Sequence, residues 1–495
     1  MTESFLIDVD DGLAPGEAAR AALELYPVQP VAMIHYSSHG RLLVLGNHDA
    51  VDAVVNRLPQ LSKICVVLTD ACTPTLSSRL GRRGIAFCDT LSDVDIAGWL
   101  GCFRGTAKRN AKIIRLEEHF GLAETGFDLV LDLFEPTFAR SPIAPIGYFA
   151  IGLADREKLT EALAELPQCL GDLDKPKYVH LEAELCDHRT AGIETCRRCF
   201  EVCGTWAIAT DDLAVTINPY LCQGCGDCAT ACPTGAIRYN YPPPEQTLFR
   251  IQRMLTTYFE RGGKVPILLM HDATKGREWL YRHRTLLPIN VLPYEIEALG
   301  ATGMDTWLMA LALGATEILI LDTGEMNEKT RALLHTQIEW SRAILKGIGY
   351  PSPCLRMVQA CEVLSASLPV HTFCPIDPLA TWSEDGGKRN IIRQAVDHLQ
   401  QQTNPLAHAV LPEGAPFGAI RIDPDACTLC LDCVSVCPEA ALVAHEGGPR
   451  LAFVEASCIQ CGTCANTCPE GAITLEPRYL YSRNAASAAK LVATR

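Results

Sequence analysis

Cysteine residues recur in this chain at intervals that suit a metal–sulfur site. Sixteen of the 24 cysteines fall into four runs, of which three are complete and one is altered. The complete runs are Cys222-x2-Cys225-x2-Cys228-x3-Cys232-Pro233, Cys427-x2-Cys430-x2-Cys433-x3-Cys437-Pro438 and Cys458-x2-Cys461-x2-Cys464-x3-Cys468-Pro469. The altered run is Cys186 followed by Cys196-x2-Cys199-x3-Cys203. Thiolates repeated at such short intervals are typical metal ligands, so the predicted chemistry is metal binding.

The complete run is that of bacterial ferredoxins, in which three thiolates hold one [4Fe-4S] cluster and the fourth holds a neighbouring cluster. Two intervening residues let a tight loop wrap one corner of the cluster, and the x3 step opens a short helix. The proline then fixes the exit at a position that needs no N–H donor. The runs come in pairs, 186–237 and 427–473, and the crossed rule then predicts four ligand sets. Cluster A takes Cys186, Cys196, Cys199 and Cys232; cluster B takes Cys222, Cys225, Cys228 and Cys203; cluster C takes Cys427, Cys430, Cys433 and Cys468; cluster D takes Cys458, Cys461, Cys464 and Cys437.

Two alternatives remain open at this point. Pairs of the C-x2-C type also bind structural zinc, although zinc sites do not need the repeated x3-Cys-Pro step. Cys186 is the second uncertainty, because nine residues separate it from Cys196 where the complete runs have two. If Cys186 is no ligand, cluster A has three cysteines and an open iron site, or a ligand such as His188.

Composition predicts a soluble, multidomain protein in a reducing compartment. The chain has 495 residues, more than one hydrophobic core holds, with 48% hydrophobic and 20% charged residues. The formal net charge of −15 disfavours nucleic acid and suits docking against basic patches. The acidic N-terminus resembles no signal peptide, and the apolar stretch 304–321 contains Asp305 and Glu317. We therefore expect a cytoplasmic protein without a membrane span.

The remaining sequence is typical of α/β domains. Short apolar runs at 31–34, 42–45, 64–68, 129–133, 265–270 and 317–321 predict buried strands, and helices are expected at 50–58 and 156–166. Thr302 is the predicted N-cap of a helix to residue 313, and Asn327 that of another ending at Gly347. The predicted domains are an N-terminal α/β domain (1–180), a two-cluster ferredoxin unit (181–240), a central α/β domain (246–403), a second two-cluster ferredoxin unit (419–478) and a tail (479–495), of which residues 482–495 are expected to be frayed. The fold class is thus α/β plus α+β, with two ferredoxin units alternating with two flavodoxin- or Rossmann-like domains.

Other candidate sites are weaker. No G-x-G-x-x-G follows a strand and no Walker A motif is present, so no flavin or nucleotide is predicted. Asp322 and the pair His271-Asp272 follow predicted strands and are expected to be ordinary turn residues. The other cysteines have no ligand spacing. Five of them are expected to be core residues, namely Cys65, Cys72, Cys88, Cys102 and Cys169. Cys354, Cys361 and Cys374 resemble no ligand set.

Four stretches give the chain a family resemblance: LCDHRTAGIETCRRC (185–199), PINVLPYE (288–295), GGKRN (386–390) and PEGAPFGA (412–419). With the cysteine runs, they resemble the four-cluster 4Fe-4S binding proteins encoded beside molybdenum- or tungsten-dependent formate dehydrogenases. The resemblance makes the Cys186 spacing a family feature and implies a formate dehydrogenase as partner. Gly204 departs from the family pattern, which has proline after the first run. Residues 264–350 also distantly resemble the flavodoxin-like δ-subunit domain of hydrogenase–heterodisulfide reductase systems, but without that domain's cysteines.

These features predict an iron–sulfur electron-transfer protein with four [4Fe-4S] clusters and redox-protein partners. Because four thiolates saturate each cluster, we expect no turnover of its own and no catalytic residue. The alternatives are a docking adaptor whose clusters are mainly structural, a component of an electron-bifurcating complex, and a catalytic subunit with an open iron in cluster A.

Overall fold

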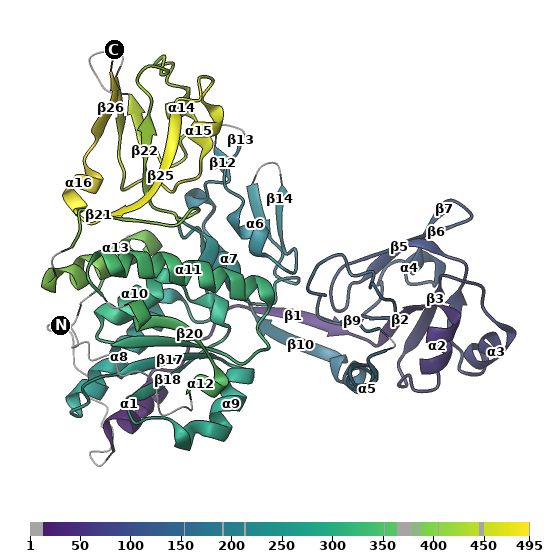
Figure 1. Cartoon of the computed structure of the whole chain (residues 1–495). Coiled ribbons are helices and arrows are strands. Elements are labelled where there is room, and N and C mark those ends of the chain that lie inside the picture. Colours follow the sequence, from purple (N-terminus) through teal and green to yellow (C-terminus); the bar gives the residue numbers. More distant parts are fainter. Residues whose placement is uncertain are drawn as a thin grey trace.

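The computed structural model joins two α/β parts and two cysteine-rich lobes (Figure 1). It describes residues 13–152, 154–190, 193–211, 214–350, 352–363, 380, 382–383, 387–403, 405–444 and 450–494. An antiparallel ribbon of β1 (Met33–Ser38) and β10 (Gly171–Pro176) connects the N-terminal α/β part to the rest of the molecule. In the described residues, no helix is both long and apolar enough to cross a membrane. A mixed α/β architecture is thereby confirmed, while the domain boundaries stay predictions.

The N-terminal part is built on a five-stranded parallel sheet in the order β4-β3-β2-β8-β9. Its strands are β2 (Arg41–Gly46), β3 (Lys63–Leu68), β4 (Ala86–Cys88), β8 (Leu129–Asp132) and β9 (Tyr148–Ala150). The runs expected at 42–45, 64–68 and 129–133 are confirmed, because a parallel sheet covered on both faces needs continuous apolar strands. The run at 31–34 is placed differently, since β1 starts at Met33 and pairs only with β10.

Helices and a small antiparallel sheet surround these strands. The helices expected at 50–58 and 156–166 occur as α2 and α5. The elements are α2 (His48–Val54), α3 (Pro74–Arg82), α4 (Leu116–His119), α5 (Arg156–Glu165) and η1 (Leu166–Cys169), with β5 (Ser92–Ala97), β6 (Arg104–Arg109) and β7 (Lys112–Arg115).

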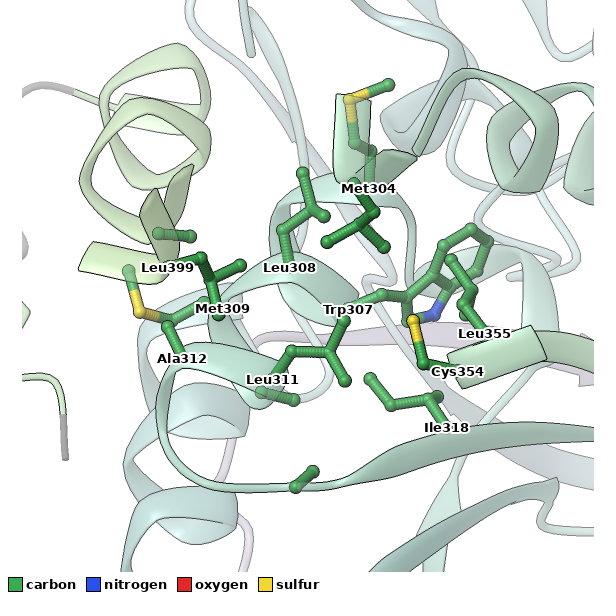
Figure 2. Packing of buried hydrophobic residues seen from close by; sticks show 14 of the residues in the cluster. Met304, Trp307, Leu308, Met309, Leu311, Ala312, Ile318, Cys354, Leu355 and Leu399 are labelled. Atoms are coloured by element: carbon green, nitrogen blue, oxygen red, sulfur yellow. The ribbon is translucent and has the colours of Figure 1, made fainter. Parts of the chain in front are cut away.

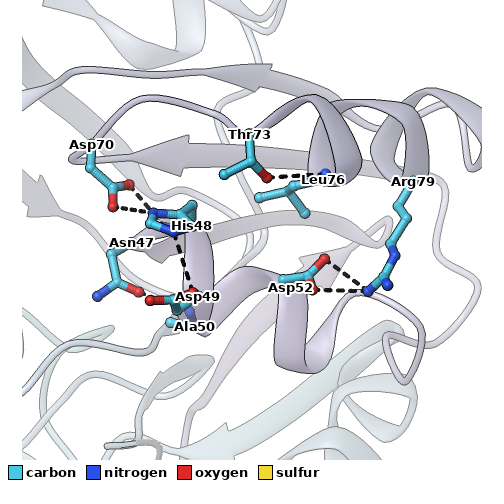
Figure 3. A network of polar contacts seen from close by, with 9 residues as sticks. All are labelled: Asn47, His48, Asp49, Ala50, Asp52, Asp70, Thr73, Leu76 and Arg79. Atoms are coloured by element: carbon cyan, nitrogen blue, oxygen red, sulfur yellow. Dashed lines mark hydrogen bonds and ion pairs between the residues drawn. The ribbon is translucent and has the colours of Figure 1, made fainter.

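Polar side chains fix the loops that follow β2 and β3 (Figure 3). Asn47 caps α2 by accepting a hydrogen bond from Ala50 N at 2.8 Å, and Thr73 caps α3. His48 Nδ1 lies 2.5 Å from the Asp70 carboxylate, which raises the pKa of this histidine. The two loops are therefore tied together across the carboxyl edge of the sheet.

The central α/β part has a four-stranded parallel sheet in the order β18-β17-β19-β20. Asn327 caps α11 as predicted, accepting from Lys329 N at 2.8 Å. The prediction for Thr302 is wrong: Gly303 is the N-cap of α10, and the Thr302 hydroxyl donates to Leu299 O instead. The elements are β17 (Ile267–Asp272), β18 (Val291–Ile296), β19 (Glu317–Asp322), β20 (Leu355–Gln359), α8 (Pro244–Glu260), α9 (Lys275–His283), α10 (Met304–Ala312), α11 (Glu328–Gly347), α12 (Ala360–Val363), α13 (Gly387–Leu399), η3 (Arg284–Leu286), η4 (Leu299–Ala301), η5 (Ser352–Cys354) and η6 (Gln400–Gln402).

Helix α10 is the centre of this core, with every residue buried (Figure 2). Trp307 is fully buried and packs in one cluster with Ile318 and Leu355 of the sheet and Leu399 of α13. The N-terminal helix α1 (Pro15–Glu24) also joins this core, through Ala19 packed against α8. Helix α13 packs along α10 and shares this core.

The two cysteine-rich lobes have matching elements. The first contains β11 (Val179–Leu181), η2 (Ala183–Leu185), β12 (Arg189–Thr190), β13 (Ile193–Glu194), α6 (Arg198–Val202), β14 (Ile208–Asp211), β15 (Ala214–Ile217), α7 (Asp227–Ala231) and β16 (Ile237–Tyr239). The second contains β21 (His408–Val410), β22 (Gly418–Ile422), α14 (Asp432–Ser435), β23 (Leu442–Ala444), β24 (Arg450–Phe453), α15 (Thr463–Thr467) and β25 (Ile473–Leu480). In the first lobe β11 pairs with β16, and in the second lobe both β21 and β22 pair with β25. The expected fraying of the tail is wrong, because α16 (Arg483–Ser487) and β26 (Lys490–Thr494) follow, and β26 pairs with β24.

Candidate metal centres

Each cysteine run forms a loop that leads into a short helix. The third cysteine of each complete run lies in that helix, as Cys228 does in α7, and the fourth follows its end, as Cys232 does. Gly226 and Gly462 start two of these helices with φ of 82° and 81°, a conformation that a side chain disfavours. The loop geometry expected from the spacing is therefore present.

The thiols of set A lie close together although they come from two runs. The pKa of Cys199 is raised to about 12, first by burial and then by the thiols of Cys196, Cys232 and Cys186. The pKa of Cys186 is also raised, by burial and by Cys232. Such effects need short separations. The structure therefore brings Cys232 of the second run to the first run, and it brings Cys186 there despite the longer spacing.

Set B shows the reciprocal exchange. Burial raises the pKa of Cys228 well above its ordinary value, and Cys225, Cys222 and Cys203 add to this effect. The thiol of Cys199, from set A, also acts on Cys228. Cys203 thus leaves the first run and joins the second, and sets A and B are neighbours.

The second lobe repeats the pattern. The pKa of Cys433 is raised to about 11, first by burial and then by the thiols of Cys430, Cys427 and Cys468. This is set C, with its last thiol taken from the fourth run.

Set D is completed in the same way. The pKa of Cys464 is raised to about 12, first by burial and then by the thiols of Cys458, Cys461 and Cys437. Cys433 of set C also acts on Cys464, so sets C and D are neighbours. The structure groups the sixteen cysteines as the crossed rule does; their role as ligands stays a prediction.

Main-chain N–H groups point at several of these sulfurs. Ala441 N donates to Cys437 Sγ at 3.2 Å, and Ala472 N donates to Cys468 Sγ at 3.4 Å. Gln460 donates both its N and its Nε2 to Cys458 Sγ, at 3.4 and 3.3 Å. Hydrogen bonds of this kind favour the thiolate over the thiol. These hydrogen bonds oppose the effect of burial and would help to hold the sulfurs as thiolate ligands of a metal centre.

The spacing of the groups bears on the size of the metal centre. Among the described residues, no three Cys, His, Asp or Glu side chains lie close enough to hold a single metal ion. Zinc bound at about 2.3 Å needs its sulfurs about 4 Å apart. A cubane carries its irons on separate corners and holds its thiolates farther apart, so the grouped thiols fit a cluster.

His188 lies beside set A. Its ring is 2% exposed and packs on Phe200, with ring centroids 5.1 Å apart. Nδ1 lies 2.7 Å from Cys196 O, so it carries the proton, while Nε2 is buried without a hydrogen-bond partner among the described residues. The alternative that His188 supplies a ligand to cluster A therefore remains open beside Cys186.

The other candidate residues have structural roles. Asp322 is fully buried and accepts from Gly324 N at 2.8 Å and from Arg331 Nε at 2.9 Å. Asp272 accepts from Thr274 N and Gly276 N at the start of α9.

The remaining cysteines differ in exposure. Cys65 and Cys88 are buried as expected, and Cys72, Cys102 and Cys169 are half-buried. Cys354 is buried, Cys361 is exposed, and Cys374 lies outside the described residues.

Buried cations near the cysteine loops could not be recognised from the sequence alone. Lys175 Nζ donates to the carbonyl oxygens of Tyr220 and Cys222, and burial lowers the pKa of this lysine to about 8. Lys388 and Arg389 make similar contacts around sets A and D. Both residues lie in the stretch GGKRN. The family resemblance of that stretch was the only feature of the sequence that indicated their importance.

Comparisons with known families agree with this geometry. Residues 426–473 match the model of the 4Fe-4S dicluster domain, and residues 215–238 match that of the 4Fe-4S binding domain. The altered first run lies outside both matches, as its spacing would lead one to expect. No curated protein matches the chain. The chain thus contains ferredoxin-type 4Fe-4S domains within a mixed α/β protein.

Proposed function

We propose that the chain is an electron-transfer protein that holds four [4Fe-4S] clusters through sixteen cysteine thiolates. The observation that supports this most directly is the exchange of the last thiol between paired runs, for example Cys232 into set A and Cys203 into set B. This exchange is the arrangement of two-cluster ferredoxins. When bound, such clusters take up and release single electrons.

The protein residues bind the clusters and keep water from them. The walls around sets A and B are apolar: Val179, Ile208, Val215, Ile237 and Tyr239 are all buried there. Burial and hydrogen bonds to sulfur are the main ways in which a protein sets the potential of such a cluster. Four thiolates per cluster leave no position for a substrate, so we propose no turnover by the chain itself.

Set C is the most accessible contact point for a partner. Cys430 is exposed, and the loops around it present the exposed carboxylates of Asp423, Asp425 and Asp432. An acidic rim suits a basic patch on another protein. The family resemblance proposes a formate dehydrogenase as that partner, in the cytoplasm, where thiols stay reduced.

The test mixes the anaerobic protein with the formate dehydrogenase of the same cells and follows cluster absorbance after formate is added. Rapid bleaching that weakens as salt rises would support a transient electrostatic contact, and bleaching that survives salt would support a permanent subunit. An adaptor with structural clusters would bind without bleaching. Neither bleaching nor co-purification would remove formate dehydrogenase from the proposal.

A further inference from the structure

The two cysteine-rich lobes meet at a cavity whose wall includes thiols of both. The cavity has a volume of about 510 Å³ and is lined by Cys196 of set A and Cys461 of set D. Arg198, Gln460 and Trp340 of α11 complete the wall between them. Sets A and D therefore face each other across one small space.

A positive charge lies in this space. Arg198 follows Cys196 by two residues and lines the cavity together with Cys461 of the second lobe. Its guanidinium carbon lies 6.0 Å from the centre of the Trp340 ring. A single arginine thus lies in the wall between sulfur ligands of both lobes, where its charge would offset part of the negative charge of two bound clusters.

Adjacent residues at the start of α13 hold the two lobes, one each. Lys388 Nζ donates to three carbonyl oxygens of the first lobe, those of Ala229 at 2.9 Å, Thr230 at 2.7 Å and Cys232 at 3.1 Å. These carbonyls lie at the end of α7, where the helix dipole favours a cation. The contact therefore fixes the segment that carries the last ligand of set A.

Arg389 makes the corresponding contact with the second lobe. Its guanidinium donates to Pro416 O at 2.7 Å, Ala456 O at 3.1 Å and Cys458 O at 3.0 Å, and it stacks 4.4 Å from the centre of the Phe417 ring. Because the two cations are neighbours in the sequence, the first turn of α13 holds both the Cys232 segment and the Cys458 segment.

The ligand loops border the same cavity: Thr195 and Arg197, beside Cys196, line it together with Ile459 and Gln460, beside Cys461. Within each lobe, the neighbouring sets are A with B and C with D, because α6 packs against α7 and α14 packs against α15.

We propose that the four clusters form one electron path in the order B–A–D–C, and that Lys388 and Arg389 are the positioning residues of its middle step. This inference rests on the proposed function and adds the sequence of steps. In the middle step, one electron passes between A and D, one cluster being oxidised and the other reduced, and no bond forms or breaks. A low-potential donor protein supplies the electron at one end of the path. In the experiment below, dithionite takes its place.

The test uses magnetic coupling between clusters in the full, dithionite-reduced chain, measured by electron paramagnetic resonance. Coupling falls with the cube of the separation, so each cluster reports on its neighbours. Cys196→Ser removes a ligand of cluster A. Because A is expected to couple with both B and D, the signals of B and D should each lose part of their broadening. Cys427→Ser, which damages C, should change the D signal and leave A and B unchanged. If damage to A leaves the C and D signals unaltered, the lobes are two separate paths and the inference is wrong.

A second pair of variants keeps every cluster ligand. Lys388→Met and Arg389→Gln should retain the iron content of the native chain but lose part of the A–D broadening, and Lys388→Arg should restore it. Lys346→Met, an exposed lysine on α11, is the matched control and should resemble the native protein. Unchanged A–D coupling in both variants would remove the positioning role. A native chain without iron and sulfide would instead overturn the proposed function, so the two failures are distinguishable.

Discussion

The crossed exchange of ligands is open to a direct genetic test at Cys232. This residue is the last cysteine of the second run and follows α7. Its thiol nevertheless raises the pKa of Cys186, Cys196 and Cys199 of the first run. Replacement by alanine should therefore damage cluster A and leave cluster B with four ligands.

The magnitude follows from the ligand sets. Four four-thiolate clusters give about sixteen irons per chain, so loss of one ligand should leave about twelve to fifteen, depending on whether the whole cluster or one iron is lost. Cys361→Ala is the matched control, because this exposed thiol lies in α12 of the central α/β part and its loss should leave the iron unchanged.

Double variants decide which run Cys232 serves. Residues of one cluster should show non-additive losses, and residues of separate clusters should show additive ones. Cys196→Ala with Cys232→Ala should lose no more than about four irons, whereas Cys225→Ala with Cys232→Ala should lose up to about eight. Iron and acid-labile sulfide are measured on anaerobically purified protein. The opposite result, with Cys225 and Cys232 behaving as one unit, would show that each run closes on its own cluster and would refute the reasoning.

Three further predictions concern separate parts of the molecule. Cys186→Ala should lose cluster A; iron and spectra identical to the native protein would assign the fourth ligand elsewhere. Asp128→Ala should lower the free energy of unfolding in urea by about 3–5 kcal/mol, because buried Asp128 accepts from Arg41 N and Nε at 2.8 and 2.9 Å and its loss leaves that arginine uncompensated. Asp70 raises the pKa of His48 in the folded state, so the stabilisation is full below the unfolded pKa of about 6.5 and is lost as pH rises through the folded value. Urea unfolding at several pH values should show this decline, and Asp70→Asn should flatten it.

The cysteine groups could be predicted from sequence because the geometry around a cluster is set by local spacing. The same holds for β2 and β3, whose apolar runs are long enough to identify strands buried on both faces. Asn327 was also a local signal, since its side chain bonds the next turn of its own helix. Thr302 failed as a cap because its hydroxyl bonds backward to Leu299 O.

Long-range placement could not be predicted in this way. Helix α1 packs on α8, more than two hundred residues away in sequence, and nothing in its own residues specifies that partner. From their own sequence pattern, Lys388 and Arg389 would be taken for ordinary surface cations. Only the fold shows that they contact the two lobes. The ferredoxin rule alone predicts that Cys232 joins set A. The contact between sets A and D, in contrast, depends on packing across the whole chain.

The central claim is that the chain holds four redox-active clusters, and counting electrons tests it most directly. Anaerobic protein is titrated coulometrically at low potential and then reoxidised, with iron, sulfide and zinc measured on the same sample. We predict about four electrons taken up and returned per chain, one for each [4Fe-4S] cluster. Stoichiometric zinc with little sulfide and no reversible uptake would contradict the account.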